Sequence, residues 1–286
     1  MQYWAIQTLN SLALGGLLFL LASGFSLIFG LMRIANLTHG ALFMLGAYVG
    51  VSALKAVPNL WLAAVVAGLA TAVFGFFVER FVLRKLAGNV LGQVLVTLGL
   101  SFILADFCLV VWGGDPIPIA TPDLLKRPLQ IAGLIFPAYR LAVVVLAVAV
   151  AAGLFLLVEK TRLGAMIRAG VDDPDMARAV GIPVSRLFTV VFCLGAALAG
   201  AGGVIAGPIM SAYPGLDADM LPLALIVVIL GGVGSLVGAF VGSFITGFVY
   251  TFGVALLPDL AYVILFLPMI LVIAFRPRGL FGKFAA

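Results

Sequence analysis

Long apolar runs recur along the whole chain, and short polar stretches separate them. Most of these runs approach the roughly 20 residues that a helix needs to cross about 30 Å of hydrocarbon. They do not alternate between apolar and polar positions, and backbone groups in lipid must be satisfied within each segment. The pattern predicts an all-α, polytopic membrane protein. The predicted spans are residues 5–31, 39–55, 60–79, 90–112, 139–158, 187–210, 220–233, 236–257 and 260–275.

Two of these spans are open to a second interpretation. The run at 39–55 is short and contains three glycines, and the run at 220–233 continues into a glycine-rich stretch. Either segment can be re-entrant or broken, because irregular backbone at membrane depth is tolerated where it lines a cavity. We therefore expect one transmembrane domain over residues 1–286 with eight or nine crossings.

Composition and charge agree with this class. The 286 residues are 64% hydrophobic and 9% charged, with a mean hydropathy of +1.30, which leaves too little polar surface for a soluble domain. Twelve of the 16 Lys and Arg lie in residues 80–89, 159–186 and 276–286 or at Arg33. Because cytoplasmic loops carry the excess of basic residues, these segments are predicted to be cytoplasmic. The expected location is the inner (plasma) membrane, which the chain crosses many times.

The largest polar interruption is the stretch 159–186, which holds nine charged residues. Asp173 can cap a helix that begins at Pro174, and Gly181 followed by a proline can end it. This predicts a helix of about two turns, near residues 174–180. So short a helix is unstable alone in water and needs a surface to lie on. Both the protein's own cytoplasmic base and a separate protein meet that need.

Three neutral polar residues recur every four positions in the span 90–112, namely Gln93, Thr97 and Ser101. This spacing places them on one stripe of a helix. Such a stripe is suited to the path of a small polar solute. Hydrogen bonding between helices is an equally good explanation of it.

The sequence lacks the motifs of several other functional classes. It contains no G-x-x-x-x-G-K-[ST] phosphate loop, so energy for transport must come from a partner or from an ion gradient. With one histidine and no nucleophile beside a base, no catalytic constellation is present, and we expect no enzyme activity, cofactor, metal or nucleic-acid partner. An ion-coupled secondary transporter is the alternative, but such transporters use ionisable groups inside the membrane. Asp106 and Glu79 are both interpreted as interfacial.

Three segments resemble the permeases of the branched-chain amino acid ABC importer family. They are LNSLALGGLLFLLASGFSLIFGLMRIANLTHGALFMLGAYVG, TRLGAMIRAGVDDPDMARAVGIPVSRLFTVVFCLGAALAGAGGVIAG and GGVGSLVGAFVG, in the order of the chain. The resemblance implies that the short helix in 159–186 is a coupling helix that docks in a groove of a cytoplasmic ABC ATPase subunit. The expected coupling residues are Asp175, Met176, Ala177, Arg178, Gly181 and Ile182.

The resemblance also implies the function and the other partners. The chain is expected to be a permease subunit that moves a small polar solute inward, a branched-chain or other amino acid, while a partner hydrolyses ATP. A second permease subunit, identical or a paralogue, is expected to complete the pore. An extracytoplasmic substrate-binding protein is expected to dock on outer loops that contain Asp115, Asp123, Asp217 and Asp219. The expected pathway residues are Gln93, Thr97, Ser101, Asn36 and His39.

Overall fold

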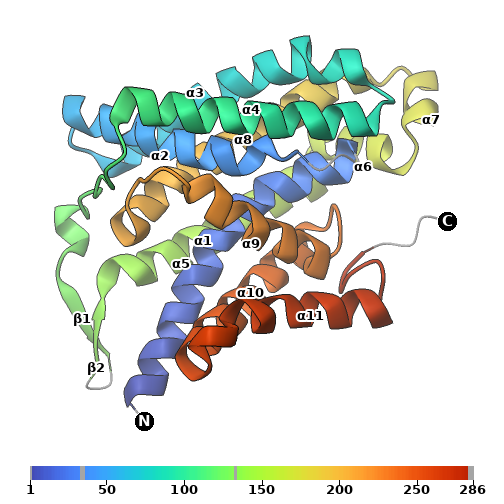
Figure 1. Ribbon diagram of the computed structural model, residues 1–286. Helices are drawn as coiled ribbons and strands as arrows, with labels where there is room; N and C mark the ends of the chain where they lie inside the picture. Colours follow the sequence, from blue (N-terminus) through green and yellow to red (C-terminus); the bar gives the residue numbers. More distant parts are fainter. Residues whose placement is uncertain (1, 33–35, 132–133, 283–286) are drawn as a thin grey trace.

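The computed structural model describes residues 2–32, 36–131 and 134–282, and two basic residues counted above, Arg33 and Lys283, lie outside this part. The described chain is almost entirely helical, with one small antiparallel hairpin (Figure 1). The helices are α1 (Gln2–Met32), α2 (Thr38–Ala56), α3 (Leu60–Phe81), α4 (Val90–Trp112), α5 (Ala138–Lys160), α6 (Arg162–Asp172), α7 (Pro174–Ala179), α8 (Val184–Met210), α9 (Leu216–Gly231), α10 (Leu236–Leu256) and α11 (Ala261–Phe275). Shorter elements are η1 (Leu83–Leu86), η2 (Asp123–Leu125), η3 (Pro258–Leu260) and the strands β1 (Pro128–Ile131) and β2 (Leu134–Pro137).

Each of the nine predicted spans coincides with a helix, so the prediction of an all-α polytopic membrane protein is confirmed. In the described part, six helices are long and apolar enough to cross a membrane by length and composition. The other three are α2, α9 and α11, with 19, 16 and 15 residues. The span that was open to a broken interpretation, 39–55, is one uninterrupted helix. The glycine-rich stretch after α9 forms the turn into α10.

Helix α8 lies at the centre of the bundle and packs against α1, α2 and α3. Glycine permits this close approach, because a Cβ on Gly24 of α1 would lie 2.5 Å from the carbonyl oxygen of Gly195 in α8. Thr71 of α3 also donates a hydrogen bond of 2.9 Å to the carbonyl of Ala196. Apolar side chains on the outer faces of α4 and α5 remain exposed, as expected where helices face lipid.

The two ends of the bundle differ in character. One end carries α6, α7 and the end of α11, and the opposite end carries the β1–β2 hairpin and the N-terminus of α1 (Figure 1). Helices α1 and α10 run antiparallel between these ends, since Trp4 stacks on Phe252 at one end and Gly30 contacts Gly234 at the other. The basic residues of 80–89, 159–186 and 276–282 therefore gather at the end that carries α7.

The contact between Gly24 and Gly195 gives a test of the packing. We expect Gly24→Ala to lower the free energy of unfolding by about 1–3 kcal/mol, because the added methyl group overlaps a backbone oxygen that cannot move aside. The matched control is Gly99→Ala, since nothing lies within 4 Å of a Cβ at Gly99. Unfolding in detergent micelles, followed by circular dichroism, measures both variants. Equal stability of the two would contradict this account of the core.

Candidate functional site

Helix α7 begins and ends as the sequence predicts. The Oδ1 atom of Asp173 accepts hydrogen bonds from the backbone N–H groups of Asp175, at 3.0 Å, and Met176, at 2.9 Å. Gly181 has a φ of +85°, in the left-handed region. The N–H groups of Gly181 and Ile182 donate back to the carbonyls of the last helical turn, which is a Schellman end. The cap and the stop hold a very short helix at the basic end of the bundle.

One side of α7 is open to solvent. Met176 is 61% exposed and Val180 is 69% exposed, and beside them Arg178 pairs with Asp175 at 2.7 Å. Ala177 is only 2% exposed, so its methyl group seats the helix on the protein instead of facing outward. Four of the six expected coupling residues are exposed, Ile182 is half-buried and Ala177 is buried.

Sequence reasoning missed the second helix of this segment, α6. Its start is capped by Thr161, whose Oγ1 accepts the N–H of Gly164 at 3.1 Å. Ile167 and Gly170 are buried on its inner side, where a Cβ on Gly170 would contact Leu187 of α8. The sequence did contain a signal for the start of α6, because Thr161 precedes apolar residues at helical spacing. Together α6 and α7 form a small platform on the ends of α1 and α8.

An ion pair with a buried carboxylate joins the end of α3 and η1 to the start of α8. The side chain of Glu79, at the end of α3, is 2% exposed and lies 3.2 Å from the guanidinium of Arg84 in η1. Thr189 of α8 donates to the same carboxylate at 2.6 Å. Arg84 also donates to the carbonyl of Ser185 at 2.8 Å, one residue after α8 begins. Glu79 is therefore a buried, paired carboxylate near the end of α3, which its interpretation as interfacial did not anticipate.

The polar stripe of α4 faces the interior of the protein. The buried residues of this helix are Gln93, Thr97, Ser101, Leu104 and Cys108. Gln93 donates a hydrogen bond of 3.1 Å to the carbonyl of Leu83 in η1. The stripe thus begins at the element that also carries Arg84.

The start of α2 packs directly on the middle of this stripe. Thr97 accepts the N–H of Leu37 at 3.3 Å on its hydroxyl and the hydroxyl of Thr38 at 2.8 Å on its carbonyl. Asn36 accepts the N–H of Thr38 at 3.2 Å, while its Nδ2 is buried with no hydrogen-bond partner in the described part of the chain. Asn36 and Thr97 are therefore brought together at one junction of α2 and α4.

His39, the other expected pathway residue on α2, turns toward a different helix. Its Nε2 lies 3.0 Å from the carbonyl of Leu21 in α1, and its ring packs on Phe25. The ring is fully buried, and among the described residues no partner reaches its Nδ1. The expected pathway residues thus lie in two places, at the junction of α2 with α4 and, for His39, at the contact of α1 with α2.

The prediction that Asp217 and Asp219 lie in an outer loop is wrong, because both belong to the first turn of α9. The Oδ2 atom of Asp217 lies 3.5 Å from the hydroxyl of Ser101, the central residue of α4 (Val90–Trp112). A Cβ on Gly40 would lie 2.7 Å from the carbonyl of Asp217, so α9 also starts against α2. The depth of Asp217 could not be seen in the sequence, because the apolar run begins only at residue 220 and a turn precedes α9.

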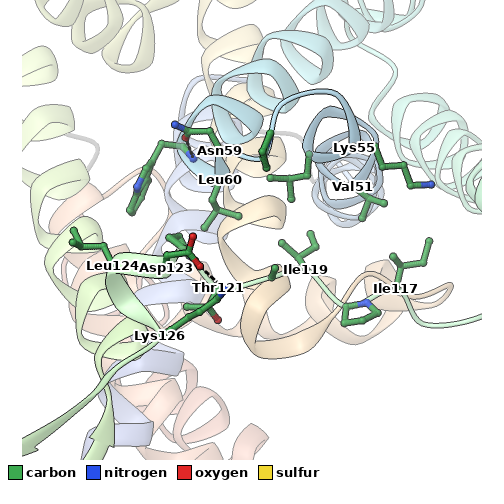
Figure 2. Close-up of a pocket in the computed structure, with 16 residues that line it drawn as sticks. Val51, Lys55, Asn59, Leu60, Ile117, Ile119, Thr121, Asp123, Leu124 and Lys126 are labelled. Atoms are coloured by element: carbon green, nitrogen blue, oxygen red, sulfur yellow. Dashed lines mark hydrogen bonds and ion pairs between the residues drawn. The ribbon is translucent and has the colours of Figure 1, made fainter.

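An open cleft of about 570 Å³ lies at the end of the bundle opposite α7. Figure 2 shows side chains of the α2–α3 turn on one side of it and residues 117–126 on the other. Lys55 and Lys126 lie at its rim, and Lys126 donates a hydrogen bond to Asp123, which holds the pKa of that carboxyl below its usual range. The cleft combines an apolar floor with charged edges.

The protein is a bundle of membrane-length helices. It has a buried neutral polar stripe inside and a small helical platform at its basic end. This is the architecture of a membrane transport permease. The chain belongs to the family described as branched-chain amino acid transport system / permease component, which matches residues 7–273. It is accordingly a multi-pass protein of the inner membrane with a role in transport, and it is not an enzyme.

Curated relatives cover nearly the whole chain. It is 30% identical to the high-affinity branched-chain amino acid transport system permease protein BraD of Pseudomonas aeruginosa, over 97% of this chain and 95% of the relative. It is 26% identical to the corresponding permease protein LivH of Escherichia coli K12, over 98% and 96%. A probable branched-chain amino acid transport permease of Methanocaldococcus jannaschii is 25% identical over 76% of this chain and 70% of that protein. No solved structure matches the chain.

The buried pair of Glu79 and Arg84 predicts an asymmetric response to mutation. We expect Arg84→Ala to lower the free energy of unfolding by about 3 kcal/mol, because it leaves a buried carboxylate without its partner. The double variant Glu79→Gln with Arg84→Ala removes the stranded charge and should be more stable than Arg84→Ala alone. Thermal unfolding in detergent gives the comparison. A double variant less stable than the single one would show that the ion pair is not the source of the effect.

Proposed function

We propose that the chain is a permease subunit of an ABC importer that carries a branched-chain or other amino acid inward, driven by ATP hydrolysis on cytoplasmic ABC ATPase subunits. The observation that carries this proposal is α7, a helix closed at both ends that presents Met176 and Val180 to solvent. Exposed apolar residues on so short an element favour a protein partner that covers them. The relatives named above are permease proteins of branched-chain amino acid transport systems, which supports an amino acid as the solute.

The contacts of α7 supply a route from the ATPase to the membrane. Helix α8 begins five residues after α7 ends, and its first turns hold Arg84 through Ser185 and Thr189. The same η1 element accepts the hydrogen bond of Gln93 through Leu83. A movement of the α7 platform therefore reaches the polar stripe of α4 through packed and hydrogen-bonded groups.

The solute path is proposed to follow this stripe and the start of α2. Gln93, Thr97 and Ser101 line the buried side of α4, and Thr38, at the start of α2, bonds both Asn36 and Thr97. His39 is proposed to fix α2 against α1, from the hydrogen-bonding distance of its ring to Leu21. A second permease subunit, identical or a paralogue, completes the pore in this proposal.

The substrate-binding protein is proposed to dock at the opposite end of the bundle. The cleft between the α2–α3 turn and residues 117–126 has an apolar floor and charged rim residues, Lys55, Asp123 and Lys126 (Figure 2). A polar rim around an apolar centre is typical of protein interfaces. This places the two protein partners at opposite ends of the bundle.

The first test concerns the docking face of α7. We expect Met176→Asp together with Val180→Asp to weaken ATPase co-purification and to abolish uptake, because two charges replace the apolar contact. Gly181→Val should act similarly, since a β-branched residue is strained at positive φ. Membrane insertion should be unchanged, because the segment lies outside the bilayer.

Val233→Asp is the matched control for this test, because Val233 is also an exposed apolar residue, in the turn between α9 and α10. It should leave the ATPase bound. Co-purification from detergent and uptake in proteoliposomes give the two readouts. Normal uptake by the α7 variants with the ATPase still bound would exclude α7 as the docking element.

The second test concerns the stripe of α4. Thr97→Leu should reduce uptake by about tenfold, equivalent to about 1.4 kcal/mol, because it removes a hydroxyl and adds bulk beside the start of α2. Thr97→Ser keeps the hydroxyl and is the control. Assembly with the ATPase should survive in both variants. If Thr97→Cys never reacts with a water-soluble thiol reagent in any nucleotide state, the stripe is structural and the path lies elsewhere.

A further inference from the structure

Asp217 is an ionisable group at half the depth of a membrane span. Its carboxylate lies 3.5 Å from Ser101, which is equidistant from the two ends of α4. The neighbouring backbone of α9 is fixed there, because Leu216 is fully buried and Gly40 of α2 touches the carbonyl of Asp217. The Asp217 carboxylate therefore cannot reach the membrane surface unless α9 rearranges.

This carboxylate has no cationic partner in the described part of the chain, where no Lys, Arg or His nitrogen lies within 4.0 Å of it. The contact to Ser101 is long for a hydrogen bond between oxygen atoms. Asp217 is also only half-buried, and the next residues of α9, Ala218 and Asp219, are exposed. The acidic turn is thus open on one side.

The open side cannot face hydrocarbon at low cost. Charged side chains inside a membrane are expensive and almost always face a water-filled cavity, a partner or a substrate path. The exposed part of Asp217 is therefore assigned to the pathway between the two permease subunits. The neutral stripe of α4 then lies directly behind it, at Ser101.

We propose that Asp217 binds the ammonium group of the amino acid during its passage, with the Ser101 hydroxyl as a second acceptor. This inference rests on the proposed function and adds a residue to the path. An ammonium group has three donors and one positive charge, which match an unpaired carboxylate with a hydroxyl beside it. A charge-assisted hydrogen bond of this kind also selects amino acids against uncharged solutes of the same shape.

Uptake of leucine by the complete complex in proteoliposomes tests the charge. Asp217→Asn should lower the uptake rate at least about tenfold, because a charge-assisted hydrogen bond is lost. The ATPase activity stimulated by the loaded binding protein should continue, and Asp217→Glu should restore at least half of the uptake. Normal uptake by Asp217→Asn would overturn the proposal.

Asp219→Asn tests whether the effect at Asp217 comes from binding the ammonium group or from the charge at the positive end of the helix dipole. Asp219 lies in the same first turn of α9, but it accepts a hydrogen bond of 2.7 Å from the hydroxyl of Tyr213. A carboxylate in this turn also stabilises the positive end of the helix. We expect Asp219→Asn to keep at least half of the uptake. A loss equal to that of Asp217→Asn would assign the effect to the dipole and overturn the proposal.

Thiol labelling tests the site without uptake. Asp217→Cys is placed in a background without Cys108 and Cys193, the two native cysteines, and is treated with a cationic methanethiosulfonate reagent. The thiol should react in at least one nucleotide state, and leucine should slow the reaction. A thiol that never reacts overturns the proposal. If wild-type uptake proved independent of ATP, the proposed function would fail, while labelling and protection at position 217 would still stand.

Discussion

Close packing around α8 is the constraint on which the rest of the molecule depends. In a membrane, helices gain little from burying apolar surface against one another, so contact and hydrogen bonding must hold them together. Here Gly195 meets Gly24 of α1 with almost no side chain between the helices, and Thr71 of α3 bonds the carbonyl of Ala196. These contacts fix α1, α2 and α3 around α8. The positions of α4 and α9 against the first turn of α2 follow from that arrangement.

The packing places the two regions with a proposed function on one continuous set of contacts. At the basic end of the bundle, α7 leads into α8, whose first turns hold Arg84. The element that carries Arg84 also accepts the hydrogen bond of Gln93, where the polar stripe of α4 begins. Further along α4, Ser101 approaches Asp217 of α9. Arg84 and Gln93 are hydrogen-bonded to neighbouring elements, whereas the Asp217 carboxylate has only its long contact to Ser101.

The spans and the ends of α7 could be predicted because their signals are local. Apolar length predicts each transmembrane helix, and Asp173 with Gly181 marks the two ends of α7. The depth of Asp217 and the burial of Glu79 could not be predicted, because both depend on which helix lies opposite. Asp217 and Asp259 both lie in the first turn of a helix, but only Asp217 lies beside α4, while Asp259 is exposed.

The central claim is that ATP hydrolysis on a partner, and not an ion gradient, drives solute through this permease. Uptake of radiolabelled leucine by proteoliposomes containing both permease subunits, the ATPases and the binding protein tests it most directly. Ionophores collapse all proton and sodium gradients, and ATP is supplied on the side of α7. The account predicts that uptake continues and stops when ATP is replaced by a non-hydrolysable analogue. Uptake that requires an ion gradient and ignores ATP would contradict it.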